Sequence, residues 1–98
     1  MAEITVNDTH ASFQSAQILD VREDAEVASG MIPGALHIPM SELQSRVDEL
    51  DQQDPVIVVC RSGNRSAHVA GALNAAGFTA DTMPGGMIAW ARAGLPTT

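Results

Sequence analysis

Four consecutive β-branched apolar residues, Val56-Ile57-Val58-Val59, constrain the fold of this chain more than any other feature. β-branched side chains favour strands, and a run that is apolar at every position indicates a strand covered on both faces. Segments with strand-like and helix-like patterns alternate along the rest of the chain, as in an α/β sheet of mainly parallel strands. We therefore expect a central five-stranded sheet with helices on both faces and the strand of residues 56–60 in its middle.

The other elements follow from apolar spacing, capping residues and turn residues. The remaining strands are expected at residues 3–6, 18–21, 35–38 and 79–83. Helices are expected from a cap at Asn7 or Asp8 to about Ser15, over residues 22–29, from Ser41 to about Leu50, from about Asn64 to Gly77, and between Gly86 and Gly94. Helical spacing predicts two buried stripes, made of Leu43, Val47 and Leu50 and of Val69, Ala70, Leu73 and Ala76. A length of 98 residues without a repeat or linker predicts one domain over residues 1–98.

Cys60 is the only cysteine, and it stands directly after the buried run. The polar, glycine-containing segment 61–66 that follows predicts a tight loop whose amides converge on one point. A helix beginning near Asn64, together with Arg61 and Arg65, would lower the thiol pKa from about 8.5 toward roughly 3.5 to 7.5. An inert buried cysteine would not explain two arginines and a glycine within the next five residues, so we interpret Cys60 as a nucleophile.

Charge narrows the class of partner. The chain has five arginines, no lysine and twelve acidic residues, for a net charge of -7, which argues against a nucleic-acid surface. Two of the five arginines lie in the loop after the cysteine, so the sequence predicts a local cationic pocket for a small anion.

One cysteine forms no internal disulfide, and no cysteine and histidine pattern indicates a metal or other cofactor. No segment resembles a signal peptide or approaches the roughly 18 apolar residues of a membrane span, so we expect a cytoplasmic protein without a membrane partner. Oligomeric state is left open.

Four motifs in order resemble the rhodanese family of sulfurtransferases, and the resemblance covers almost the whole chain. They are the early strand motif at residues 19–23, the Gly-x-Ile-Pro-Gly-Ala turn at 30–35, the loop Cys60-Arg61-Ser62-Gly63-Asn64-Arg65-Ser66, and the closing Gly-Gly-x-x-x-Trp segment within 84–90. The resemblance implies a rhodanese-like fold for the single domain.

The resemblance also implies persulfide chemistry. Cys60 would take a sulfur atom from an anionic donor such as thiosulfate and pass it to cyanide, a thiol or a thioredoxin-like protein acceptor. A mercaptopyruvate-type donor and a desulfurase persulfide stay open as alternatives. The predicted substrate-binding residues are Arg61, Ser62, Gly63, Asn64, Arg65 and Ser66, whose amides form an anion cradle and whose two arginines attract the donor. Two residues are predicted to support the site: Asp20 by bracing the loop from the neighbouring strand end, and Arg22 through an ion pair or a backbone hydrogen bond.

Two alternatives compete with this interpretation. Cysteine-dependent phosphatases and arsenate reductases also hold a thiolate in an anion-binding loop, but they place an arginine six positions after the cysteine. Here that position is Ser66 and the arginine, Arg65, comes one residue earlier, which suits a single sulfur atom better than a phosphate group. The second alternative is a non-catalytic binding or sulfur-relay module, although inactive members of the family usually lack the cysteine.

Overall fold

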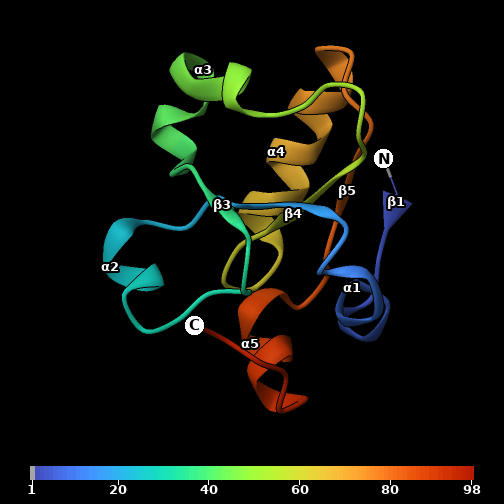
Figure 1. The fold of residues 1–98 in the computed structure, drawn as a ribbon. Coiled ribbons are helices and arrows are strands. Elements are labelled where there is room, and N and C mark those ends of the chain that lie inside the picture. Colours follow the sequence, from blue (N-terminus) through green and yellow to red (C-terminus); the bar gives the residue numbers. More distant parts are fainter. Residues whose placement is uncertain (1) are drawn as a thin grey trace.

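The five strands form one parallel sheet with the order β1-β5-β4-β2-β3 in the computed structural model, which describes residues 2–98 (Figure 1). The strands are β1 (Ala2–Glu3), β2 (Gln17–Asp20), β3 (Leu36–His37), β4 (Val56–Val59) and β5 (Ala80–Thr82). All four residues of β4 are buried, and β4 lies in the middle of the sheet as its apolar run predicted. The expected α/β class with a parallel five-stranded sheet is confirmed.

In the part of the chain that the structure describes, five α-helices complete the fold. They are α1 (Val6–Ser12), α2 (Asp24–Val27), α3 (Leu43–Arg46), α4 (Asn64–Ala75) and α5 (Gly86–Arg92), and 3-10 turns at Met40–Glu42 and Val47–Glu49 flank α3. In Figure 1, α3 and α4 occupy the upper part of the view and α1 and α5 the lower part.

β4 supplies alternate side chains to two separate core clusters, because successive residues of a strand point to opposite faces. Val56 and Val58 belong to one cluster, which also contains Val69 and Leu73 of α4. Ile57 and Val59 belong to the other, which contains Met87 and Trp90 of α5. Helices therefore cover both faces of the sheet, as expected.

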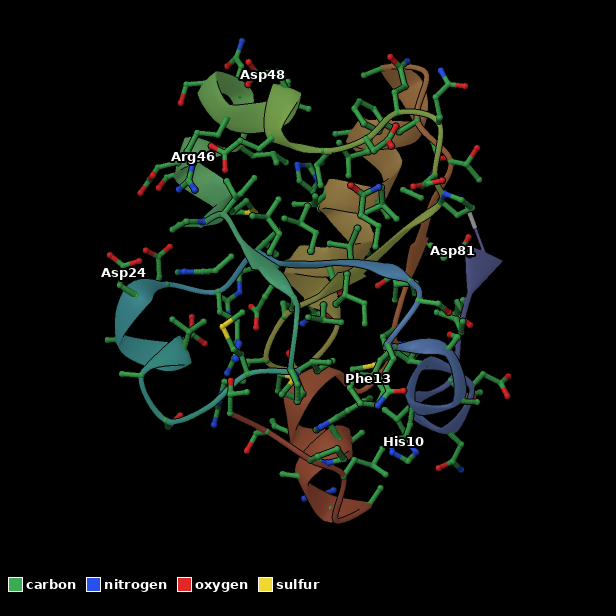
Figure 2. The ribbon with its side chains drawn as sticks, viewed as in Figure 1. His10, Phe13, Asp24, Arg46, Asp48 and Asp81 are labelled. Carbon is green, nitrogen blue, oxygen red and sulfur yellow. The ribbon has the colours of Figure 1, made fainter. Side chains whose placement is uncertain are left out.

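An aromatic cluster joins α1 to α5. His10 stacks on Phe13 with ring centroids 5.5 Å apart (Figure 2). Both rings meet Trp90 edge-on, with centroid distances of 5.9 and 6.2 Å. Trp90 is fully buried, and its Nε1 donates to the carbonyl of Pro96 over 2.8 Å. This hydrogen bond satisfies the indole and ties the C-terminal segment to α5.

The first helix and the first strand begin earlier than the sequence pattern predicted. The side chain of Thr5 accepts the amide of Asp8 over 3.0 Å, so Thr5 is the N-cap and α1 starts at Val6. The expected cap at Asn7 or Asp8 is therefore wrong. Because the helix begins there, the first strand ends at Glu3 and not at residue 6.

Two expected helices are shorter or less regular. Residues 22–29 were expected to be helical, but only Asp24–Val27 are. The helix expected from Ser41 is broken because the backbone of Arg46, with φ -122°, departs from α-helical geometry. Leu50 is still buried, and Leu43 and Val47 still pack against the core, so the predicted stripe survives without a continuous helix.

α4 ends one residue before the predicted buried stripe does. Ala76 is its C-cap and is exposed, while Gly77 turns the chain with φ +95°. Of the four residues predicted for that stripe, Val69, Ala70 and Leu73 are buried and Ala76 is not.

The carboxyl ends of three strands meet at one edge of the sheet. Asp20, which ends β2, pairs in register with Val59 of β4, and Val58 pairs with Thr82, which ends β5. Ligand sites in open parallel sheets lie at this edge, and Cys60 follows β4 there.

None of the helices within residues 2–98 has both the length and the apolar composition that crossing a membrane requires.

Candidate active site

Cys60 Sγ occupies the position that a capping side chain takes at the start of a helix. It accepts the amide of Gly63 over 3.0 Å and the amide of Ser66 over 3.4 Å. Gly63 is the N-cap of α4 and has no side chain of its own, and Ser66 is the third residue of the helix. The sulfur therefore satisfies amide groups that a helix start leaves without an intrahelical partner. These groups favour a negatively charged acceptor.

The pKa of the Cys60 thiol is lowered from its ordinary value. Burial alone would raise this pKa, since the residue is 1% exposed, but hydrogen bonds outweigh that effect. The thiol donates to Ser66 Oγ, 3.5 Å away; toward the thiolate, the donors are the Ser66 hydroxyl and the amides of Ser66, Gly63 and Ser62. The loop and helix start thus stabilise a thiolate, as the sequence predicted.

The N-terminus of α5 holds the peptide groups that lead into the loop. The amide of Met87 donates to the carbonyl of Cys60 over 2.9 Å, and the amide of Ile88 donates to the carbonyl of Arg61 over 3.1 Å. These bonds fix the orientation of both peptides. Gly86, which lies against them, is buried and has φ +55°.

A side chain at Gly86 would collide with the loop. A Cβ there would lie 2.5 Å from the carbonyl oxygen of Arg61 and closer still to that of Cys60. Sequence reasoning noted the glycine pair before the last helix as a turn but did not identify Gly86 as a residue that shapes the site. The signal available was two adjacent glycines directly before a helical pattern.

Gly63 is a second place where the loop requires glycine. Its φ is +108°, and an added Cβ would lie 3.2 Å from the amide nitrogen of Gly85. The residues on either side of it, Ser62 and Asn64, are exposed, so they contribute backbone groups and not side chains to the inside of the loop. The turn that follows β5 and the loop thus pack backbone against backbone, with no room for a side chain between them.

Arg65 is bound to an acidic residue and is not a free cation. Its Nη1 and Nη2 donate to the two carboxylate oxygens of Glu26 over 2.7 and 2.8 Å. Glu26 also accepts the amide of Glu23, and these contacts lower the pKa of Glu26 to about 2. The pair joins α2 to the start of α4, and sequence reasoning missed it because the two residues lie 39 positions apart.

Arg61 is the loop arginine that remains available to a ligand. It is exposed, and within residues 2–98 it forms no ion pair. It lines an open hollow of about 280 Å³ beside the loop, together with Arg22, Glu26, Ser29, Met87, Ile88 and Ala91. The predicted cationic character of the pocket therefore rests on Arg61, while the charge of Arg65 is balanced by Glu26.

Asp20 and Arg22 form a buried ion pair at the end of β2. Arg22 Nη2 lies 2.8 Å from Asp20 Oδ2 and also donates to the carbonyl of Gly30 over 2.8 Å. The side chain of Asp20 makes its hydrogen bonds with Arg22, and none reaches the loop of residues 60–66. The expectation that Asp20 braces this loop directly is wrong. The pair instead holds the segment that carries Glu26.

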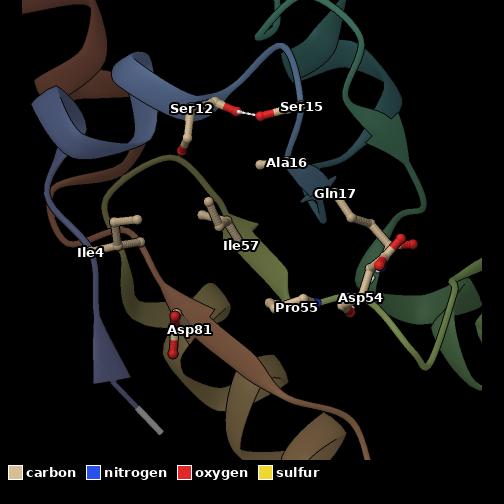
Figure 3. Close-up of a pocket in the computed structure, with 9 residues that line it drawn as sticks. All are labelled: Ile4, Ser12, Ser15, Ala16, Gln17, Asp54, Pro55, Ile57 and Asp81. Atoms are coloured by element: carbon tan, nitrogen blue, oxygen red, sulfur yellow. Dashed lines mark hydrogen bonds between the residues drawn. The ribbon is translucent and has the colours of Figure 1, made fainter.

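A hollow of about 300 Å³ opens at the other end of β4 (Figure 3). Pro55 and Ile57 line it at the amino end of the strand, with Asp54, Asp81 and the serines of positions 12 and 15 nearby. The strand separates this hollow from Cys60, so it is not part of the candidate site. Within residues 2–98, side chains of His, Cys, Asp and Glu form no group of three that could hold a metal ion.

Replacing Glu26 with Gln is expected to destabilise the protein by about 1 kcal/mol at neutral pH, because the charge of the pair with Arg65 is lost. The pKa of Glu26 is lower in the folded protein than its ordinary value of 4.5, so its contribution is complete above that pH and disappears as the pH falls toward about 2. Denaturant unfolding of both proteins at several pH values should show the difference shrinking on acidification.

Glu49→Gln is the matched control for this prediction. Glu49 also forms a two-point ion pair with an arginine, Arg46, but Glu49 is exposed and the two residues lie only three positions apart. This variant should lose less stability than Glu26→Gln. Equal losses would show that the link between α2 and α4 adds nothing beyond an ordinary surface pair.

Comparisons with known proteins identify the family to which this fold belongs. The family described as a rhodanese-like domain matches residues 5–93. A sulfurtransferase from Allochromatium vinosum is 40% identical over 87 residues, which cover 88% of this chain and 81% of that protein. The Bacillus subtilis protein YtwF is 45% identical over 73 residues, covering 74% of this chain and 71% of YtwF. The crystal structure of a rhodanese-related protein from Thermoplasma volcanium matches with a TM-score of 0.95 and 31% identity, over 100% of this chain and 98% of that one.

Proposed function

Because the chain belongs to the rhodanese-like domain family, we propose that it is a sulfurtransferase in which Cys60 carries the transferred sulfur as a persulfide. The observation that carries this proposal is the set of donors around one sulfur atom. The amides of Gly63 and Ser66 and the hydroxyl of Ser66 all lie within 3.5 Å of Cys60 Sγ. A thiolate held in this way is a nucleophile at neutral pH and needs no histidine partner.

The first half-reaction loads the cysteine. The thiolate of Cys60 attacks the outer sulfur of a donor such as thiosulfate, and a new S–S bond forms. The S–S bond of the donor breaks, and its electron pair leaves with sulfite. The persulfide keeps negative charge on its outer sulfur, which amides of the loop of residues 61–66 would stabilise.

The second half-reaction unloads it. A nucleophile such as cyanide or the thiolate of a small thiol or thioredoxin-like protein attacks the outer sulfur. The S–S bond to Cys60 breaks with its electron pair on Sγ, so the thiolate is regenerated and the cycle closes without net oxidation of the enzyme.

Arg61 directs the choice of donor toward anions. It is the exposed loop cation on the hollow beside the site, whereas Arg65 is held by Glu26. A single free guanidinium favours a small anion such as thiosulfate over a neutral donor, mainly by raising its local concentration.

Incubation with thiosulfate tests the proposal. The intact protein should gain the mass of one sulfur atom on Cys60, and cyanide or a reduced thiol should then remove it. Protein alkylated at Cys60 beforehand is the control and should gain nothing, because the chain has no other cysteine. An unchanged mass of the unblocked protein would contradict thiosulfate as donor. Failure with a panel of other persulfide and thiosulfonate donors would contradict sulfur transfer itself.

A further inference from the structure

Thr82, the last residue of β5, places a buried hydroxyl beside the candidate active site. The residue is 3% exposed, and its Oγ1 lies 2.7 Å from Ser66 Oγ. Within residues 2–98, Ser66 is the hydrogen-bond partner of this hydroxyl. No sequence motif pointed to Thr82, which is 16 positions from Ser66.

The hydrogen atoms around Ser66 Oγ can be counted. Besides Thr82, its neighbours are the carbonyl oxygen of Gly63 at 3.0 Å and Cys60 Sγ at 3.5 Å. Ser66 has one proton to donate and two lone pairs to accept with. The carbonyl has no proton to give, and neither does the sulfur when it is a thiolate. In the thiolate state, Thr82 is therefore the neighbour that can donate to Ser66.

The opposite direction leaves two groups without a bond. If Ser66 donated to Thr82, the proton of the buried Thr82 hydroxyl would have no acceptor, which is unfavourable in a protein interior. The proton of Ser66 would also be withdrawn from the thiolate. The count thus favours a hydrogen-bond chain in which Thr82 donates to Ser66 and Ser66 donates to Cys60.

The same hydrogen-bond chain can form whether Cys60 is a thiol or a thiolate. When Cys60 is protonated, its thiol can donate to the second lone pair of Ser66, and Ser66 donates to the carbonyl of Gly63. When Cys60 is ionised, the Ser66 hydroxyl turns to the sulfur. The Gly63 carbonyl keeps a partner, because it also accepts the amide of Ala67 over 3.1 Å. Thr82 donates in both states.

We propose that Thr82 is a positioning residue for Cys60: its hydroxyl donates to Ser66 Oγ and so directs the Ser66 proton toward the sulfur. This inference rests on the proposed function of Cys60 as the sulfur carrier. Hydrogen bonds in a chain polarise one another, and the effect is largest when the chain ends on a charge. Removing the first donor should weaken the last bond more for the thiolate than for the thiol.

The charged groups around the loop stay the same in the variants that test this. They are Arg61 and Arg65 within the loop, Glu26 on α2, and the buried pair at the end of β2, Asp20 and Arg22. A change in the behaviour of the sulfur can then be attributed to the hydroxyl of Thr82.

Thr82→Val removes this hydroxyl and keeps the shape of the side chain, and Thr82→Ser keeps the hydroxyl. The measurement is the rate of Cys60 alkylation by iodoacetamide against pH, which reports the thiolate fraction without requiring sulfur transfer. The valine variant should show about a threefold lower thiolate fraction below the midpoint, a rise of about half a pH unit. The serine variant should match the wild type. If valine prevents folding, Thr82→Ala provides the same comparison.

Ser66→Ala supplies the background that separates positioning from a general disturbance. In that background, adding Thr82→Val should cause no further shift of the midpoint, because Thr82 acts through Ser66. A midpoint in Thr82→Val at or below that of the wild type would overturn the proposal, and so would a full shift that persists without Ser66. If the wild-type protein shows the expected pH dependence of alkylation but transfers no sulfur, the proposed function is overturned instead.

Discussion

Cys60→Ser is expected to reduce sulfur transfer by at least about 10³-fold, the largest effect of any substitution in this chain. A serine hydroxyl does not ionise near neutral pH, and it cannot form the S–S bond that holds the transferred atom. The measurement is the rate of thiocyanate formation from thiosulfate and cyanide, together with the mass of the intact protein after exposure to the donor.

The fold should survive this substitution. Serine is close to cysteine in size, and its oxygen can accept the amides of Gly63 and Ser66 that bind the sulfur. We expect the free energy of unfolding to change by about 1 kcal/mol or less. Wild-type protein alkylated at Cys60 is the matched chemical control, and its residual rate should equal that of the serine variant. Turnover near the wild-type rate in either would show that another group is the nucleophile.

Gly86→Ala is expected to have the second-largest effect, on both stability and activity. An added Cβ would overlap the carbonyl groups of Cys60 and Arg61, and these are the groups that accept the first amides of α5. Because the overlap is with backbone, either the loop or the helix must move. We expect a loss of about 2–4 kcal/mol in the free energy of unfolding.

The displaced loop should also form weaker hydrogen bonds to the thiolate. Sulfur transfer should fall by about 10-fold or more, since small displacements of reacting groups are costly. The pH midpoint of Cys60 alkylation should rise toward the value of about 8.5 for a free cysteine.

Gly94→Ala is the control for the backbone conformation alone. Gly94 has φ +70°, close to the +55° of Gly86, but an added Cβ at Gly94 would meet nothing within 4 Å. This variant should lose only the roughly 1–2 kcal/mol that a left-handed conformation costs a residue with a side chain, and its activity should not change. If Gly86→Ala behaved in the same way as Gly94→Ala, the contact between α5 and the loop would not shape the site.

Local patterns in the sequence predicted the class of fold and the place of Cys60, the proposed nucleophile, in it. The apolar run of β4, the glycine in the loop and the start of α4 at Asn64 are properties of neighbouring residues, and all three are found where they were expected. Errors fell at the ends of elements. Thr5 caps α1 because its hydroxyl reaches the amide of Asp8, and several nearby polar residues could have done the same.

The role of the loop arginines shows what local patterns cannot decide. Arg61 and Arg65 have similar neighbours in the sequence, and both were expected to attract the donor. The fold brings Glu26 of α2 to Arg65 and leaves Arg61 exposed, so the two differ in available charge. The support expected from Asp20 changed for the same reason, because its carboxylate is occupied by Arg22.

Local sequence patterns were enough to predict that this chain builds a parallel α/β sheet and that Cys60 follows its central strand at a helix start. Those features depend on residues close together in the chain, where chemistry and spacing are directly visible. The distant groups around the loop became visible in the folded chain: Gly86 against the carbonyls of the loop, Glu26 on Arg65, and Thr82 behind Ser66. These contacts arise because parallel strands end at one edge of the sheet, and the packing of helices on that edge sets which side chains meet.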